Sequence, residues 1–338
     1  MINLVSDTVT KPTPAMLEAM FAAEVGDDVF GEDPTVRALE AKAAALFGME
    51  SAVFCPSGTM TNQIAIKVHT RPLDELICDE LPHVYQSEVG GYAFHSGIAV
   101  KLLPGQNGKI TAEQVEKAIK PDYDWMPVSR LVVLENTCNI GGGTFYTKAE
   151  IAPIAALCRE KGLALHLDGA RVFNALVESG DTAQDMGSLF DSISICLSKG
   201  LGAPVGSLLL GNQSFIRTAR RVRKAMGGGM RQAGYLAAAA IYALDHHIDR
   251  LKVDNQKAKE LGAALLSVPY VSQIRPVATN IVFFDVATPM TAPRFLELLA
   301  AKGIKATSFG PQTLRFVTHL DYSDEMHQEV LEVLASMK

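Results

Sequence analysis

Short apolar runs alternate with helical patterns through the first three quarters of the chain. Consecutive apolar positions predict strands that are buried on both faces. The expected strands are Ser51–Cys55, Glu75–Cys78, Ala99–Leu103, Arg130–Glu135, Leu163–Asp168, Ser192–Leu197 and Gly206–Leu210. The expected helices between and after them are Gly58–His69, Thr111–Lys120, Lys148–Lys161, Ser214–Lys224 and Gln232–Lys252. This order predicts an α/β fold with a mainly parallel central sheet and helices on both faces.

The pattern changes near Asp254, where helices and strands no longer alternate regularly. We therefore expect a large α/β domain over residues 1–254 and a smaller C-terminal α+β domain over residues 255–338. The sequence leaves open whether the N-terminal segment packs on the small domain. The elements expected in the small domain are the helices Asn255–Leu266, Ala292–Lys302 and Ser323–Met337 and the strands Asn280–Asp285 and Thr313–Val317.

Composition excludes several classes of protein. The chain has 338 residues, 48% of them hydrophobic, which is enough for a sizeable core. Its formal net charge of −6 argues against binding to nucleic acid or to an anionic membrane surface. No signal peptide and no transmembrane run are expected. The five cysteines form no CxxC pair, and their odd number inside apolar runs indicates reduced thiols in a cytoplasmic protein. No metal-binding residues are assigned, and the sequence leaves open whether the reaction requires a metal.

Two polar residues follow apolar runs in the middle of the chain. Lys199 lies between the run ending at Leu197 and a glycine-rich turn, and Asp168 ends the run LALHLD. In open parallel sheets, ligands bind at the carboxyl ends of strands. An amine for a Schiff base and an acid for a pyridine nitrogen are what pyridoxal 5′-phosphate (PLP) needs from a protein. The pair therefore predicts PLP as the cofactor.

Each of these residues also has a simpler interpretation. An isolated lysine in a loop is usually a solvated charge, and an aspartate before a helix often serves as its N-cap. The glycine-rich turn and the presence of both groups favour the cofactor interpretation for Lys199. For Asp168 alone, the two interpretations are about equally well supported.

Further candidates surround the proposed cofactor. The stretch Pro56–Asn62, which includes Ser57, Gly58 and Thr59, joins a strand to a helix whose free N–H groups could bind a phosphate. The same residue types also serve as ordinary helix caps. His83 could stack on a cofactor ring and exchange protons, or it could be a surface or capping histidine.

Three arginines are candidates for binding anions. Arg171 lies three residues after Asp168 and could reach the same ligand through its planar guanidinium. Arg231 follows three glycines, which suggest either a subunit contact or a flexible hinge, and it could bind phosphate. Arg315 lies in an apolar strand, where it needs an anion, either a ligand carboxylate or a structural acid.

These motifs taken together resemble the low-specificity L-threonine aldolases, which belong to the β-eliminating lyase group of PLP fold type I enzymes. The resemblance runs from end to end and implies an aspartate aminotransferase-like fold and a homotetramer with active sites at subunit interfaces. The stretches that carry it are SDTVTKPT (6–13), EVGDDVFGEDP (24–34), PSGTMTNQ (56–63), VVLENT (132–137), LHLDGAR (165–171), SICLSKGLGAPVGSLL (194–209), GGGMRQAG (227–234) and LRFVTHLD (314–321).

The resemblance also implies roles for individual residues. The substrate would be a small amino acid, L-threonine or L-allo-threonine, which is cleaved to glycine and an aldehyde. Lys199 would carry the cofactor, Asp168 would pair with its ring nitrogen, and His83 would stack on the ring. The groups implied for the phosphate are Gly58, Thr59 and Arg231, the last from a neighbouring subunit, and those implied for the substrate carboxylate are Ser6, Arg171 and Arg315.

Two positions depart from the pattern of these aldolases. Cys138 stands where they commonly have a histidine after ENT, and Trp125 stands in a loop where many have another. His83 is then the expected base for the β-hydroxyl proton. The alternatives are another reaction on the same fold (β-elimination, racemisation or serine hydroxymethyltransferase-like activity) and a binding protein without catalysis. A dehydrogenase is disfavoured, because no G-x-G-x-x-G follows the first strand.

Overall fold

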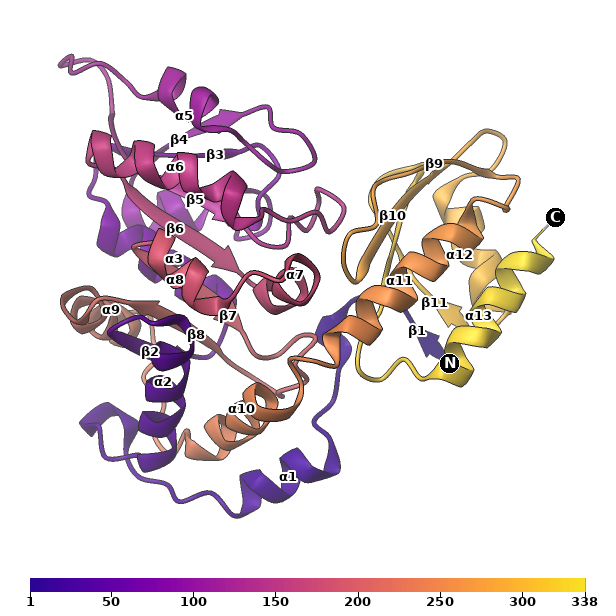
Figure 1. Ribbon diagram of the computed structural model, residues 1–338, viewed down its shortest axis with the longest axis horizontal. Coiled ribbons are helices and arrows are strands. Elements are labelled where there is room, and N and C mark those ends of the chain that lie inside the picture. The colour runs from indigo at the N-terminus through magenta and orange to yellow at the C-terminus, as the bar shows by residue number, and fades with distance from the viewer. Residues whose placement is uncertain (338) are drawn as a thin grey trace.

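The computed structural model describes residues 1–337 and has two lobes (Figure 1). The larger lobe is built on a seven-stranded sheet with the order β2-β8-β7-β6-β5-β3-β4. Five neighbouring strands are parallel, whereas β8 is antiparallel to both of its neighbours. The strands are β2 (Ser51–Cys55), β3 (Asp74–Asp79), β4 (Ala99–Leu103), β5 (Val128–Glu135), β6 (Ala164–Gly169), β7 (Ser192–Cys196) and β8 (Ser207–Gly211).

Helices cover both faces of this sheet. On one face, α3 (Gly58–His69) and α9 (Gln213–Ala225) bury an apolar cluster against β2 and β8. A larger apolar cluster on the other face includes side chains of α2 and α6. The remaining helices of this lobe are α1 (Pro14–Phe21), α2 (Pro34–Phe47), α4 (His83–Gln86), α5 (Ala112–Ala118), α6 (Lys148–Lys161), α7 (Val172–Ser179), α8 (Ala183–Leu189) and α10 (Gly234–His246).

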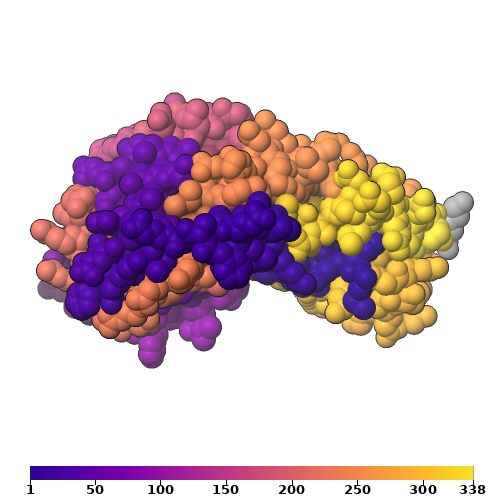
Figure 2. Space-filling view, turned by 90° about the horizontal axis from the view of Figure 1, so that it is seen from below, coloured from indigo at the N-terminus to yellow at the C-terminus, as the bar shows by residue number. Residues whose placement is uncertain are grey.

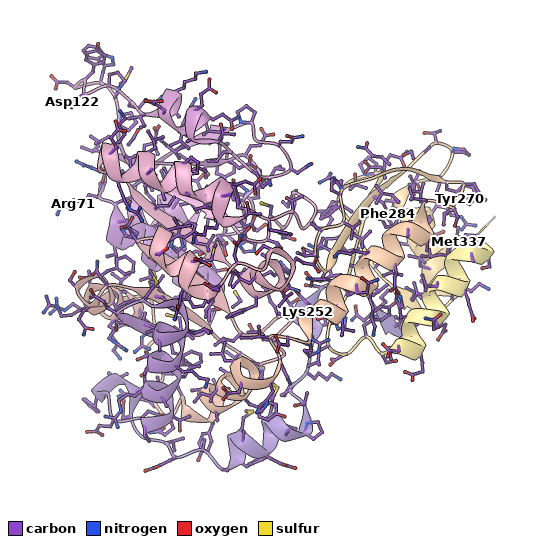
Figure 3. The ribbon with its side chains drawn as sticks, viewed as in Figure 1. Arg71, Asp122, Lys252, Tyr270, Phe284 and Met337 are labelled. Carbon is purple, nitrogen blue, oxygen red and sulfur yellow. The ribbon has the colours of Figure 1, made fainter. Side chains whose placement is uncertain are left out.

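The smaller lobe contains a four-stranded antiparallel sheet with the order β12-β13-β10-β9. Aromatic side chains, among them Phe284 (labelled in Figure 3), pack between this sheet and the helices. The elements are β9 (Val271–Ile274), β10 (Ile281–Val286), β11 (Ile304–Lys305), β12 (Thr307–Ser308), β13 (Thr313–Val317), α11 (Leu251–Leu265), α12 (Ala292–Ala301) and α13 (Asp324–Ser336).

The N-terminal segment connects the two lobes. Its first strand, β1 (Ile2–Asn3), pairs in parallel with β11 of the small lobe. From there the chain crosses to the large lobe, where α1 packs beside α10, and Figure 2 shows this path along one face of the molecule. Helix α11 also lies between the lobes, with Lys252 labelled near its start in Figure 3. Residue 254 falls inside this helix. The division into two domains at that residue stays a prediction.

The expected elements agree with the structure except in one region. A single helix over Gln232–Lys252 is wrong, because α10 ends at His246 and α11 begins at Leu251. The break coincides with two contacts to the loop after β7: the His247 ring bonds the Leu201 carbonyl, and Arg250 reaches the Gly200 carbonyl. No helix within residues 1–337 is long and apolar enough to cross a membrane. All five cysteines are buried and unpaired.

Candidate active site

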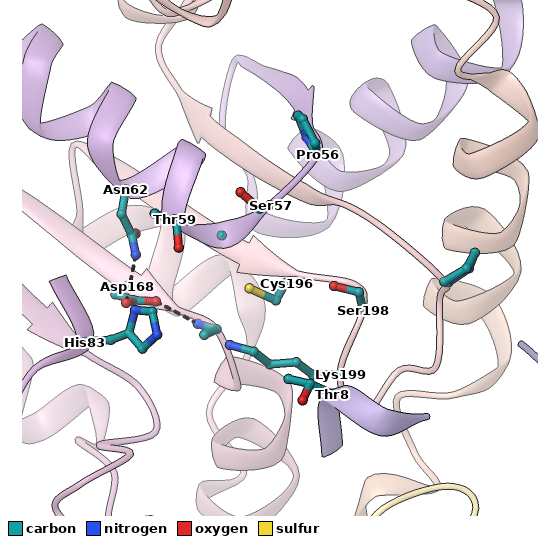
Figure 4. A pocket seen from close by; sticks show the side chains of 13 residues that line it. Thr8, Pro56, Ser57, Thr59, Asn62, His83, Asp168, Cys196, Ser198 and Lys199 are labelled. Carbon is teal, nitrogen blue, oxygen red and sulfur yellow. Dashed lines mark hydrogen bonds between the residues drawn. The ribbon is translucent and has the colours of Figure 1, made fainter. Parts of the chain in front are cut away.

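A polar cavity of about 280 Å³ lies at the carboxyl ends of β6 and β7, beside the first turn of α3 (Figure 4). Parallel strands commonly place ligand sites at this end of a sheet. The cavity brings together the lysine, the aspartate, the histidine and the helix start that the sequence singled out. Its lining residues are Thr8, Pro56, Ser57, Gly58, Thr59, Asn62, His83, Asp168, Ala170, Cys196, Ser198, Lys199 and Pro204.

Lys199 is half-buried and lies in the loop that follows β7. Its carbonyl accepts hydrogen bonds from the Thr10 hydroxyl at 2.9 Å and from the Gly202 amide at 2.8 Å. These bonds fix the backbone from two sides. In Figure 4 its side chain extends toward the part of the pocket where Asp168 and His83 lie.

Asp168 is 1% exposed near the end of β6. One carboxylate oxygen accepts a hydrogen bond from the Asn62 amide at 2.9 Å, and the other accepts one from the Ala170 backbone at 3.2 Å. Helix α7 begins only at Val172, with Arg171 as its N-cap. The helix-cap interpretation of Asp168 is therefore wrong, and the buried carboxylate lines the pocket instead.

His83 begins α4 and is held by a second buried carboxylate, that of Glu88, at 2.9 Å from its Nδ1 atom. Burial alone would lower the pKa of His83, but the bond to Glu88 and the charge of Asp168 raise it above its ordinary value. The Nδ1 atom donates to Glu88 when the ring is neutral, so Nε2 keeps its lone pair.

The same three side chains approach one another closely enough to hold a cation. Ligand atoms of His83, Glu88 and Asp168 lie within 4.8 Å of one another. However, N–H donors surround the two carboxylates, since Asn62 donates to both and Gln63 donates to Glu88 at 2.6 Å. The carboxylates of Glu88 and Asp168 thus already accept hydrogen bonds from amide N–H groups. That no metal binds here stays a prediction.

The start of α3 forms another wall of the pocket. The Ser57 hydroxyl caps the helix by accepting a hydrogen bond from the Met60 amide at 3.2 Å. A Cβ atom on Gly58 would lie 2.6 Å from the Cys196 sulfur, so only glycine lets the helix start approach the end of β7. Thr59 is exposed in this turn. The first N–H groups of a helix are suited to binding a phosphate.

Arg171 is engaged by a carboxylate of the N-terminal segment. Its Nε and Nη2 atoms each donate to Asp7 at 2.6 Å, and both side chains are buried. Asn280 donates to the same carboxylate at 3.1 Å. Burial alone would raise the pKa of Asp7, but the Arg171 guanidinium lowers it to about 2. The role of Arg171 toward a substrate carboxylate stays a prediction.

Arg315 is buried without a carboxylate partner among the described residues. It donates to the Asn139 side chain at 2.9 Å and to the Val5 carbonyl at 3.0 Å, and its Nε atom has no partner. Burial and the neighbouring Arg171 lower the pKa of Arg315 to about 10. An uncompensated buried guanidinium is suited to an anion. The Ser6 hydroxyl caps the turn that starts at Asp7 by accepting a hydrogen bond from the Thr8 backbone amide.

Ser6, Arg171 and Arg315 lie outside the pocket lining, and so do three further residues that the sequence singled out. Arg231 is largely exposed and pairs with Asp27 at 2.8 Å. Trp125 is 76% exposed in the loop whose tip is near Asp122 in Figure 3. Cys138 is fully buried, and burial raises the pKa of its thiol well above the ordinary value. Neither Cys138 nor Trp125 replaces a base in this pocket.

The sequence reasoning missed three residues at or behind this pocket. Asn62 lines the pocket, Glu88 is buried outside the lining and bonds Asn62 and His83, and Asp7 holds Arg171. Asn62 lies within a stretch already singled out, on the helix after the Ser57 cap. Glu88 lies five positions after His83, beyond the end of α4, and this spacing is a weak signal. Nothing local marks Asp7 as a partner of Arg171, because the two meet only through the tertiary fold.

Comparison with known proteins identifies the family of this chain. The family model described as beta-eliminating lyase matches residues 3–289. The chain is 42% identical to the low specificity L-threonine aldolase of Escherichia coli K12 over 98% of this chain and 97% of the relative. It is 40% identical to the low-specificity L-threonine aldolase 1 of Arabidopsis thaliana over 94% of this chain and 91% of the relative.

Solved structures place the fold in the same group. The Leishmania major threonine aldolase superposes with a TM-score of 0.87 at 24% identity and covers 99% of both chains. The α/β fold of PLP fold type I enzymes, expected from the sequence, is thereby confirmed. The matches cover nearly the whole chain, and we conclude that it belongs to the beta-eliminating lyase family.

Proposed function

We propose that the protein is a PLP-dependent threonine aldolase, a carbon–carbon lyase. It cleaves L-threonine, L-allo-threonine and related β-hydroxy-α-amino acids to glycine and an aldehyde. The observation that carries this proposal is the pocket itself, which Lys199 and Asp168 line together beside the start of α3. An amine, a buried carboxylate and a helix N-terminus match the aldehyde, the ring nitrogen and the phosphate of PLP. When bound, PLP supplies an electron sink for the electron pair left on Cα as the Cα–Cβ bond breaks.

The protein's own residues have distinct tasks in this proposal. Asp168 would accept a hydrogen bond from the ring nitrogen and keep that nitrogen protonated. Lys199 would provide the amine that holds the cofactor, and Ser57, Gly58 and Thr59 would hold the phosphate. His83 would lie against the ring, and its Nε2 atom would take the proton of the β-hydroxyl.

The substrate carboxylate needs a cation in the same region. Arg315 is suited to this task, because it is buried and has no acidic partner among residues 1–337. Arg171 and Ser6 complete the proposed carboxylate site. Asp7 accepts hydrogen bonds from two nitrogen atoms of Arg171 at 2.6 Å. The Arg171 guanidinium is therefore held in one orientation toward the proposed carboxylate site.

We also propose that the protein is a homotetramer in the cytoplasm, with Arg231 contributing to the phosphate site of a neighbouring subunit. The exposed position of Arg231, outside the lining of its own pocket, supports a role in trans. Five buried, unpaired cysteines are typical of a reducing compartment.

Product analysis tests the proposed reaction. Incubation with L-threonine should yield acetaldehyde and glycine in equal amounts, whereas 2-oxobutanoate would indicate elimination instead. Borohydride treatment followed by peptide mapping should find the cofactor on Lys199. The variant Lys199→Ala should lose both the visible absorption band and the cleavage, and Lys161→Ala, which removes an exposed lysine of α6, should keep both. An adduct on another residue would contradict the proposed site.

A further inference from the structure

A chain of polar side chains, all buried except the half-buried His69, runs between α3 and the sheet and ends at Asp168. The His69 ring lies 2.8 Å from the Ser192 hydroxyl, which lies 2.8 Å from Nδ1 of His166. Nε2 of His166 lies 3.2 Å from the Asn62 oxygen, and Asn62 in turn donates to Asp168. Such buried polar networks are costly unless every member is satisfied. This one therefore calls for an explanation that an apolar interface would not need.

The direction of each hydrogen bond follows from its chemistry. The Asn62 amide nitrogen donates to Asp168 and Glu88, both at 2.9 Å, so its oxygen must face His166 and accept. Nε2 of His166 therefore carries a proton. Burial lowers the pKa of His166 to about 3, so the ring is neutral, and its bare Nδ1 accepts from the Ser192 hydroxyl.

Two periodicities bring these residues together. His166 and Asp168 are two positions apart in β6 and so share one face of the sheet, and Ser192 of β7 lies opposite His166 in the register. Asn62 and His69 are seven positions apart in α3, about two turns, and so share one face of the helix. The helix lies on that face of the sheet, and the polar chain passes back and forth between them.

We infer that His166, Asn62 and Ser192 are positioning residues for the carboxylates of the cofactor site. His166 fixes the orientation of the Asn62 amide, and that amide fixes the side chains of Asp168 and Glu88. Ser192 selects the His166 tautomer that makes this possible. The inference rests on the proposed function, because Asp168 must be held as an oriented acceptor only if it receives the ring nitrogen of PLP.

A competing hydrogen bond makes the role of Ser192 testable. The backbone carbonyl of Ser192 lies 3.2 Å from Nδ1 of His166 and would accept a proton placed there. In Ser192→Ala, the hydroxyl that donates to Nδ1 is gone and only this carbonyl remains. The proton should then move from Nε2 to Nδ1, and Asn62 should lose its donor, although almost no volume has been removed.

The main experiment measures PLP affinity after the cofactor is removed and titrated back. His166→Leu removes the donor to Asn62 and should raise the dissociation constant of PLP about tenfold or more. The Asn62 amide that His166 orients donates to two carboxylates, and hydrogen bonds to charged groups are among the stronger ones. His166→Gln places an amide N–H near the position of Nε2 and should stay within about threefold of the wild type. The pH dependence of the cofactor's visible absorption should shift in the leucine variant and remain nearly unchanged in the glutamine variant.

His327→Leu provides a matched control. His327 is 3% exposed and bonds Glu260 in the small lobe, so its loss carries a similar folding cost without touching the polar chain. It should leave PLP affinity and the absorption titration unchanged. Wild-type affinity in a folded His166→Leu, or equal defects in His166→Leu and His166→Gln, would overturn the inference.

Ser192→Ala decides the matter if His166→Leu does not fold. Weaker PLP binding, with a shifted absorption titration, would support the inference, and wild-type behaviour on both measures would overturn it. Failure of the proposed function has a different signature. In that case the wild-type protein itself would show no PLP band and no acetaldehyde, whatever the variants do.

Discussion

His83 is the titratable side chain best placed to exchange a proton with a ligand in this pocket. Its Nδ1 atom is committed to Glu88, and 31% of the side chain remains exposed. Cys138 is fully buried with a raised thiol pKa, and the Trp125 indole accepts no proton. The departures from the aldolase pattern at these two positions therefore leave His83 as the candidate base.

His83→Asn should lower kcat for cleavage of L-threonine by about 10²- to 10⁴-fold, because asparagine keeps hydrogen bonding to Glu88 but is no base near neutral pH. PLP binding should persist. In the wild type the neutral ring is the active form, so kcat/KM should rise with pH through a pKa above the ordinary 6.5. This rise of kcat/KM with pH should be absent in His83→Asn. Cys138→Ala should change the rate little, and an inactive Cys138→Ala beside an active His83→Asn would reverse the assignment.

Local pattern was enough to find some site residues and not others. Lys199 and Asp168 were predictable because each follows an apolar run, and strand ends are visible in the sequence. His166 could have been found by the same reasoning, since it shares a sheet face with Asp168. Asn62 and Asp7 could not be assigned partners, because their hydrogen bonds span 106 and 164 positions of the chain.

At the scale of elements, the N-terminal segment is tied to both lobes. Strand β1 pairs with β11, and a few residues later Asp7 bonds Arg171 of the large lobe and Asn280 of the small lobe. The Asp7 carboxylate is fully buried. This one side chain therefore joins three segments that are distant in the sequence.

Asp7→Asn should lower the free energy of unfolding at pH 7 by about 3–5 kcal/mol, because it leaves the Arg171 charge buried and unpaired. The stabilisation belongs to the ionised carboxylate, whose pKa falls from 3.8 to about 2 on folding. It is present above pH 3.8 and lost as the pH falls through 2. Urea unfolding of both proteins from pH 7 downward measures this. Glu113→Gln, at an exposed helical pair with Lys117, is the control and should change stability little.

Element prediction succeeded where hydrophobic periodicity was uninterrupted. Strands Ala99–Leu103 and Thr313–Val317 and helix Lys148–Lys161 have the expected bounds. The expected helix Gln232–Lys252 failed, because residues 247–250 continue an acceptable pattern while long-range hydrogen bonds turn the chain there. The antiparallel direction of β8 was equally invisible, since an apolar run looks the same in either direction.

At the scale of the whole molecule, the surface near Arg231 differs from an ordinary solvated face. Phe30 is 73% exposed and lies under the Arg231 guanidinium. Aromatic and arginine side chains are both enriched in protein interfaces, and here one exposed aromatic ring lies beside an arginine. Arg231 also lies outside the lining of its own pocket, which is consistent with a site completed by a second copy of the chain.

Light scattering should therefore find an oligomer, most simply a homotetramer, and mixing two inactive variants should test whether its sites are shared. Lys199→Ala and Arg231→Ala should each be nearly inactive alone. After unfolding and refolding together, some sites receive Lys199 from one subunit and Arg231 from the other, and about a quarter of the wild-type activity should return if assembly is random. Refolding each variant separately before mixing is the control and should restore nothing. If both residues serve the same subunit's pocket, no mixture recovers activity, and a fully active monomer would contradict the shared site directly.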